Sequence, residues 1–98
     1  MSADTEIEIF FRVTKEYRIW VDEEGIGRIR ILKNVNLKTI MNLIEQVYHK
    51  INKNKNKKRI VFYISKSLYS NMSDNSKAFL DFCRNNLDIE LDIILIER

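Results

Sequence analysis

The residues in this sequence best suited to binding chemistry are arginines and aromatic side chains that recur two positions apart in the first third of the chain. They are Phe10, Arg12, Arg18, Trp20, Arg28 and Arg30. Residues two apart on a β-strand project from the same face. Guanidinium groups bind phosphate through paired hydrogen bonds, and aromatic rings stack on unpaired bases. This set therefore predicts a surface that binds nucleic acid.

A second basic element is the segment from Lys50 to Arg59, KINKNKNKKR, which carries five lysines, one arginine and no acid. Asparagines and mutually repelling lysines favour a loop over a helix. Lysine-rich segments are attracted to the nucleic-acid backbone. The candidate phosphate contacts in this loop are Lys53, Lys55, Lys57 and Lys58. The simpler interpretation, a solvated connection without a binding function, stays open.

Hydrophobic periodicity places the arginines on a three-stranded antiparallel meander. Apolar residues alternate with others from Glu6 to Val13, from Tyr17 to Val21 and from Arg28 to Ile31. Such alternation is the period of a β-strand. The tetrapeptide Asp22–Gly25 lies between the last two segments and predicts a tight turn, with the glycine at a positive φ.

The apolar faces of the three strands predict their register, since a slip of one residue would turn every side chain to the other face. The expected pairs are Val13 with Tyr17, Phe11 with Ile19, Ile9 with Val21, Ile19 with Ile29, and Tyr17 with Ile31. On the opposite face this register aligns two rows, Arg12-Arg18-Arg30 and Phe10-Trp20-Arg28. Like charges directly opposed on neighbouring strands destabilise a sheet, so the arginine row predicts an anionic ligand. A structural interpretation stays open, in which the arginines are ordinary exposed residues that share their face with Glu6 and Glu8, and Phe10 and Trp20 form a cross-strand pair beneath a helix.

The second half of the chain predicts alternating helices and strands. Apolar residues from Leu37 to Ile51 recur at the spacing of one helix face. Ile60–Ile64, IVFYI, is apolar and aromatic throughout, which is typical of a parallel central strand buried on both faces. A second helix is expected from Ser73, and Ile89–Leu95 alternate in a last strand.

The element order is therefore βββαβαβ in a single α/β (α+β) domain that covers residues 1–98. Because strand–helix–strand crossovers join parallel strands of one sheet, we expect a five-stranded mixed sheet with two main helices. This order of elements resembles that of the ribonuclease H-like fold, whose opening meander is followed by alternating helices and strands. No sequence motif accompanies the resemblance, so it is an analogy of architecture and implies no activity.

Catalysis would need a constellation of groups that the sequence does not complete. The ribonuclease H pattern would place acids on the first strand, on the first helix and just after the central strand, and Glu8 and Glu45 could fill the first two places. The third place holds Ser65–Ser67, whose central lysine would oppose a metal ion. His49 has no second histidine for a zinc site, and Cys83 has no adjacent base. We expect no catalytic residue, no metal and no cofactor.

Composition limits the class of protein. Its 98 residues suit one hydrophobic core, and 17 Lys and Arg against 14 Asp and Glu give a mild net charge of +3. No apolar segment approaches the length of a membrane span, and the first residues lack the pattern of a secretory signal. The single cysteine suits a reducing compartment. We therefore expect a soluble, cytoplasmic protein without a membrane partner.

Two functions from different classes fit these observations. The first is a small non-catalytic nucleic-acid-binding accessory protein, whose arginine and aromatic face contacts phosphates and bases. The second is a protein-interaction module, an adaptor subunit or inhibitor of a larger nucleic-acid-processing machine, because tryptophan and arginine are also common interface anchors. Pairing of edge strands between two chains would make either protein a homodimer. The choice between DNA and RNA stays open.

Overall fold

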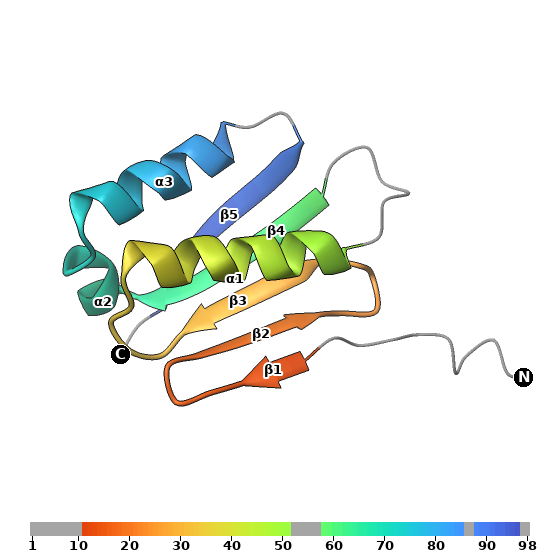
Figure 1. Ribbon diagram of the computed structural model, residues 1–98, viewed down its shortest axis with the longest axis horizontal. Helices are drawn as coiled ribbons and strands as arrows, with labels where there is room; N and C mark the ends of the chain where they lie inside the picture. Colours follow the sequence, from red (N-terminus) through yellow and green to blue (C-terminus); the bar gives the residue numbers. More distant parts are fainter. Residues whose placement is uncertain (1–10, 52–57, 86–87, 97–98) are drawn as a thin grey trace, which may run out of the picture.

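The computed structural model describes residues 11–51, 58–85 and 88–96. Its elements are β1 (Phe11–Val13), β2 (Tyr17–Val21), β3 (Gly27–Ile31), α1 (Leu37–Lys50), β4 (Lys58–Ser65), α2 (Lys66–Ser70), α3 (Asp74–Arg84) and β5 (Ile89–Ile96). The strands form one mixed sheet of five in the order β1-β2-β3-β4-β5 (Figure 1). The predicted class and element order are confirmed, and the short helix α2 is an addition to them.

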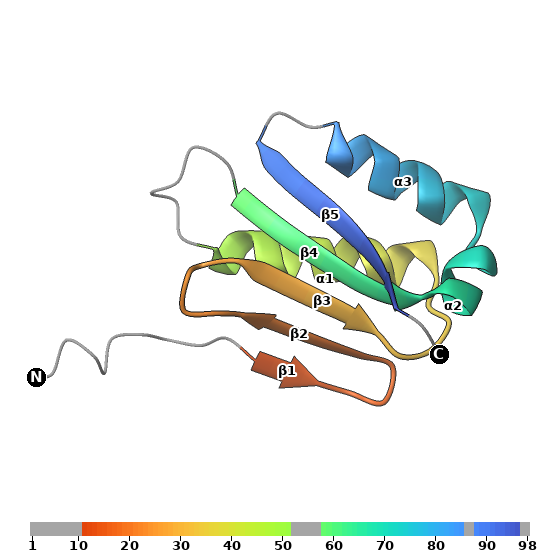
Figure 2. The ribbon, with the colours of Figure 1, turned by 180° about the vertical axis from the view of Figure 1, so that it is seen from behind.

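Both long helices cover the same face of the sheet. The three strands β3, β4 and β5 are parallel neighbours in chain order, so two right-handed crossovers place α1 and α3 on one side. Figure 1 shows the helices in front of the strands, and Figure 2 shows the strands in front of the helices. The opposite face carries no helix within the described part of the chain, and we call it the open face.

The core lies between the helices and the sheet. Helix α1 buries Ile40, Leu43, Ile44 and Val47, which recur at helical spacing, and its N-cap is Asn36, whose Oδ1 accepts from the Thr39 amide at 2.9 Å. Helix and sheet approach closely at Gly27, where an added Cβ would lie 2.1 Å from Cγ1 of Val47. A larger residue at this position would push α1 away from β3.

Strand β4 is an inner strand with a parallel neighbour on each side. Ile60 and Phe62 are fully buried against the helices, and Val61 is only 4% exposed on the open face. The prediction of a parallel strand buried on both faces is therefore confirmed, although β3 takes the middle place in the sheet.

The predicted register between the first two strands is wrong by one residue. The structure pairs Phe11 with Trp20, Arg12 with Ile19, and Val13 with Arg18. Since side chains alternate between faces, Arg12 lies on the same side as Ile19, away from the arginines of the open face. Phe11 and Val13 take its place and are 62% and 49% exposed. The predicted residues before Phe11, Ile9 and Phe10 among them, lie outside the described residues.

The turn between β1 and β2 explains this register. The amide of Thr14 donates to the carbonyl of Tyr17 at 2.9 Å, and the Thr14 hydroxyl accepts from the amides of Glu16 and Tyr17 at 3.0 and 3.1 Å. The loop therefore has two residues, whereas the predicted register needed three. Loop length sets the register of a hairpin. The register predicted between β2 and β3 is confirmed, with Ile19 opposite Ile29 and Tyr17 opposite Ile31.

Candidate functional site

The strand register aligns two rows of side chains across the open face. The first row is Phe11, Trp20, Arg28, Val61 and Asp92; the second is Val13, Arg18, Arg30, Tyr63 and Ile94. Each row begins with an apolar residue on the edge strand β1; the first row has one cation, on β3, and the second has one cation on β2 and one on β3. Most of the predicted binding residues that the structure describes are thus brought together on the open face.

Arg18 and Arg30 form the centre of this surface. They lie directly opposite one another on β2 and β3. Arg18 is exposed and Arg30 is partly buried, and neither guanidinium has a hydrogen-bond or ion-pair partner among the described residues. Two like charges therefore occupy opposed positions without a counter-charge among the described residues, an arrangement that costs free energy in the unliganded protein.

Arg28 differs from this pair because its charge is compensated within the chain. Its Nε donates to Oδ2 of Asp22 at 2.9 Å, its Nη2 lies 2.9 Å from the same oxygen, and its Nη1 donates to the Tyr63 hydroxyl. Burial lowers the pKa of Arg28, but the bonds with Asp22 and Tyr63 outweigh it and raise the pKa. Arg28 therefore fixes the turn after β2 to strand β4.

The turn itself is built around the carboxylate of Asp22. Its Oδ1 accepts from the amides of Glu24 and Ile26 at 2.9 and 3.0 Å, and Gly25 takes the predicted positive φ, 82°. Partial burial raises the pKa of Asp22, but the hydrogen bonds from Ile26, Arg28 and Glu24 together lower it. The carboxylate stays charged, and the loop is held rigidly beside the arginines.

Aromatic rings flank the arginine pair. The planes of Trp20 and Tyr63 are parallel to within 1°, with centroids 6.4 Å apart. A shallow hollow of about 460 Å³ lies on the open face, lined by Phe11, Val13, Arg18 and Trp20. Sequence reasoning missed Phe11 and Tyr63. The alternation of β4 carried a signal for Tyr63, since every second residue of a strand shares a face, whereas Phe11 depended on the turn.

Acidic side chains bound the basic surface at two sides. A second hollow, about 380 Å³ in volume, lies beyond Trp20 and is lined also by Asp22, Glu23, Glu24 and Arg28. Across the sheet, Asp92 on β5 accepts from Nη2 of Arg59 at 3.2 Å. An anion is therefore attracted to the middle of the open face and repelled on the side of Glu23 and Glu24, whereas the charge of Asp92 is compensated by Arg59.

The lysine-rich loop contributes little to the described site. Lys53, Lys55 and Lys57 lie outside the described residues. Lys58 begins β4 and ties it to α1, because its Nζ donates to the carbonyl of Tyr48 at 3.0 Å and lies 3.8 Å from the centroid of that ring. The alternation of β4 places Lys58 on the same side as the buried Ile60, away from the open face.

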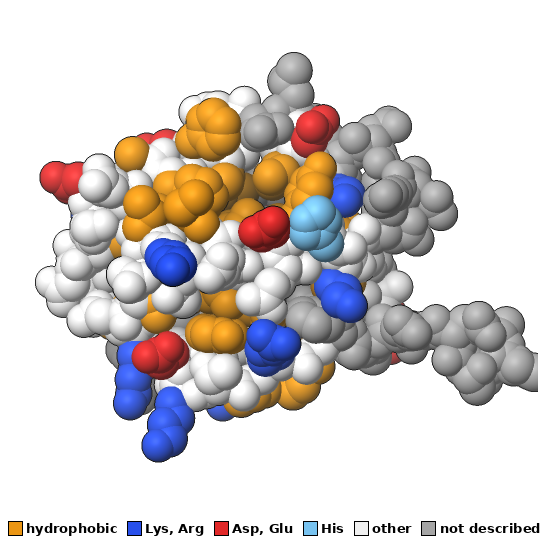
Figure 3. Space-filling model, in the orientation of Figure 1, with side chains coloured by type: hydrophobic (Ala, Val, Ile, Leu, Met, Phe, Trp, Pro, Cys, Tyr) orange, Lys and Arg blue, Asp and Glu red, His pale blue; other side chains and the backbone are white. Residues whose placement is uncertain are grey.

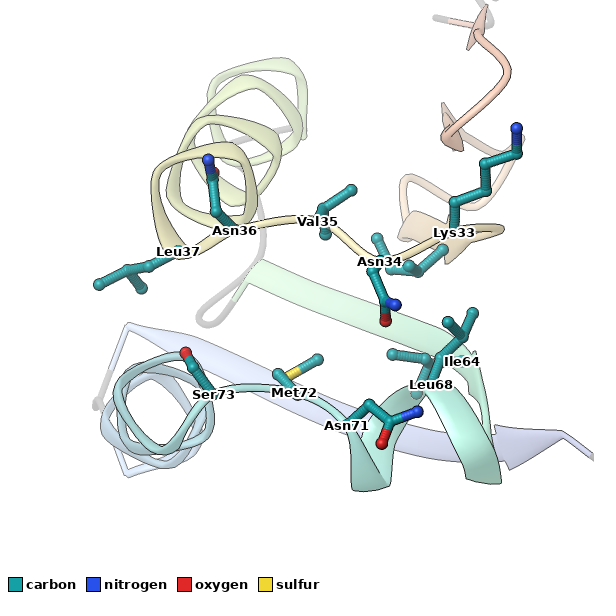
Figure 4. A pocket seen from close by; sticks show the side chains of 11 residues that line it. Lys33, Asn34, Val35, Asn36, Leu37, Ile64, Leu68, Asn71, Met72 and Ser73 are labelled. Carbon is teal, nitrogen blue, oxygen red and sulfur yellow. The ribbon is translucent and has the colours of Figure 1, made fainter.

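A separate pocket of about 220 Å³ lies where β3 and β4 end and α1 and α3 begin. Figure 4 shows the segment before α1 on one side and the segment from α2 to α3 on the other, with Lys33 pointing away. Asn36 and Ser73 line it, but their side chains cap the helices by accepting from the amides of Thr39 and Ser76 at 2.9 and 3.1 Å. One amide in the first turn of each helix is thus already engaged by its cap.

The groups considered for catalysis do not gather into a site among residues 11–51, 58–85 and 88–96. No cluster of His, Cys, Asp or Glu in these ranges could hold a metal ion. Glu45 lies exposed on α1, 3.8 Å from Nε2 of His49, and Glu8 is outside the described residues. Cys83 is buried, and burial raises the pKa of its thiol. No described helix combines the length and apolar character needed to cross a membrane.

Comparisons with known proteins return no significant match, whether with protein-family models, with curated proteins or with solved structures. The chemistry and geometry of the open face are therefore the basis for assigning a function.

Proposed function

We propose that this protein is a small non-catalytic nucleic-acid-binding accessory protein that contacts phosphates and bases through its open face. The Arg18–Arg30 pair carries the proposal, because the two arginines occupy directly opposed positions and their guanidinium groups have no partner among the described residues. A phosphate placed between them would accept charge-assisted hydrogen bonds from both and would remove their mutual repulsion. A bound anion would thus remove an electrostatic repulsion that destabilises the free protein.

The aromatic residues support contacts to bases. Trp20 is partly buried and Phe11 is 62% exposed, so both rings present surface beside the arginine pair. Stacking of a base on an aromatic ring contributes about 1–3 kcal/mol and tolerates any sequence. The lysines predicted to contact phosphates, Lys53, Lys55 and Lys57, would add sequence-independent attraction. We assign the protein to the cytoplasm, since the unpaired Cys83 suits a reducing compartment.

The proposal is tested by fluorescence anisotropy with labelled DNA and RNA oligonucleotides at two salt concentrations. We expect micromolar or tighter binding that weakens as salt rises. The variant Arg18→Gln/Arg30→Gln is compared with Arg59→Gln/Arg84→Gln, whose arginines are paired with Asp92 and Asp81. Both variants lose the same charge, but only the first is expected to lose tenfold or more in affinity. Absence of binding at low salt, or equal losses in the two variants, would refute the proposal.

A second candidate function, a protein-interaction module, is favoured by apolar surface outside the arginine pair. On the helical face, apolar side chains gather over α1 and α3 (Figure 3), and Met41 and Phe82 are 45% and 65% exposed. Parallel strands are normally covered on both faces, yet Ile94 of β5 is 45% exposed on the open face. Light scattering during size-exclusion chromatography checks for a homodimer, which Phe82→Ser or Ile94→Ser should then dissociate.

A further inference from the structure

We infer that the open face takes a single unpaired nucleic-acid strand, with one phosphate between Arg18 and Arg30 and the adjoining base stacked on Trp20. This inference rests on the proposed function and names the class of nucleic acid.

The breadth of the sheet disfavours insertion of this face into a groove of undistorted B-DNA. Neighbouring strands lie about 4.8 Å apart, so the five strands span about 19 Å between the outer two. The major groove of B-DNA is about 12 Å wide and the minor groove about 6 Å. Arg18 and Arg30 lie on β2 and β3, with β1 on one side and β4 and β5 on the other. A groove of undistorted B-DNA is too narrow to admit this surface, whereas the bases of an unpaired strand are free to contact it.

The spacing along β2 matches one nucleotide. Arg18 and Trp20 are two residues apart on the same face, which separates them by about 6.8 Å along the strand. The hollow of about 460 Å³ that they share with Phe11 and Val13 adjoins the ring of Trp20. A phosphate bound by Arg18 therefore has its own sugar and base within reach of the hollow and the indole.

Trp20 is oriented before any ligand binds. The ring of Tyr63 lies parallel to the indole, and Arg28 holds the Tyr63 hydroxyl while it is itself held by Asp22. A stacking surface that is already ordered costs less conformational entropy on binding. The indole is thus a preorganised platform for a base.

The surrounding acids limit the length of the bound segment and fix where its phosphate lies. Glu23 and Glu24 line the hollow beyond Trp20, and Asp92 closes the row on β5. A phosphate is therefore favoured on the Arg18 side of the indole and opposed on the other side. The two arginines should together contribute about −1.4 to the log–log salt slope of single-strand affinity.

The experiment uses Trp20 as its own reporter, since it is the only tryptophan of the chain. An unpaired octanucleotide, an abasic strand of equal length and a hairpin duplex are titrated while indole emission and anisotropy are recorded. We expect the unpaired strand to quench the indole emission. We expect the abasic strand to bind about 5- to 150-fold more weakly, the loss of one stacked base, and without quenching. The duplex should also bind more weakly and leave the emission unchanged.

Two variants test whether binding needs an aromatic ring at position 20 or only a large apolar side chain there. Trp20→Phe keeps an aromatic surface and should retain most of the affinity measured by anisotropy, whereas Trp20→Leu should lose as much as the abasic strand does. Thermal melting confirms that both variants are folded. Equal or tighter binding of the duplex, or unquenched binding of the unpaired strand, would overturn the inference while the proposed function stands. Failure of every oligonucleotide to bind would overturn both.

Discussion

Replacing Arg30 by glutamine should stabilise the free protein, although it removes a residue of the proposed binding site. Arg30 lies directly opposite Arg18, and neither has a partner among the described residues. Glutamine keeps much of the length of the side chain and removes only the charge. The expected gain in the free energy of unfolding is the repulsion that the substitution abolishes.

The size of this gain follows from the cross-strand geometry. Directly opposed side chains have Cβ atoms about 5 Å apart, and flexible guanidinium groups can separate to about 7 Å. Two unit charges at about 7 Å in water repel by about 0.6 kcal/mol. Screening reduces this to about 0.5 kcal/mol at 0.01 M salt and to less than about 0.1 kcal/mol at 1 M. For a domain of this size the low-salt gain corresponds to a rise of about 2–4 °C in Tm.

The assay is thermal unfolding followed by circular dichroism at the two salt concentrations. Arg59→Gln is the matched control, because it removes one charge from the same face but breaks the 3.2 Å contact with Asp92. Loss of such an exposed pair costs about 0.2–1 kcal/mol, so this variant should melt at the same or a lower temperature. A fall in Tm for Arg30→Gln at low salt, or equal shifts in the two variants, would show that the arginine pair carries no uncompensated repulsion.

Three further predictions concern other parts of the fold. Gly27→Ala should lower the free energy of unfolding in urea by about 1–3 kcal/mol, because its methyl would lie 2.1 Å from Val47. Val47→Ala in the same chain should recover part of that loss, and independent, additive costs would contradict the close contact. The pKa of Asp22 is lowered on folding, so its contribution to stability is present above its ordinary value of 3.8 and is lost as pH falls below that value. Asp22→Asn should therefore make Tm depend less on pH in the acidic range, and an unchanged dependence would refute this. Ser73→Ala should cost about 1 kcal/mol by removing the cap on the Ser76 amide, which Ser73→Asp should restore in the same melting assay.

Elements with a strong period and a buried face were predictable from the sequence. The apolar stripe of α1 and the continuous apolar run of β4 have this property, and the structure confirms both elements. The β2–β3 register followed for the same reason, since Ile19 and Ile29 are completely buried and a slip would expose both. Where one face of a strand is buried, the pattern of apolar residues predicts the register, because only one register buries all of them.

The register of β1 lacked that constraint. All three residues of β1 are exposed, and the described contacts of α1 reach β2, β3 and β4. Turning Phe11 to one face or the other therefore changes little buried area. The two-residue turn at Thr14 decided the pairing, through hydrogen bonds that hydrophobic alternation does not encode. The pairing of Arg28 with Asp22 was not predictable for a related reason, because it depends on the conformation of the turn that carries Asp22.

The same topology that leaves one face open also makes the arginine pair tolerable. If the last strand lay beside β1 instead of β4, a right-handed crossover would carry α3 over β2 and β3 on the open face. Only a left-handed crossover would avoid this. With the right-handed crossover, Arg18 and Arg30 would lie beneath a helix, and two unpaired guanidinium groups in such a position would cost several kcal/mol each. The order β3-β4-β5 keeps both helices on the other side, so the pair stays in contact with solvent and the repulsion stays below about 1 kcal/mol. On β2 and β3, arginines alternate with buried isoleucines. This alternation is therefore compatible with the observed strand order and not with an order that places the last strand beside β1.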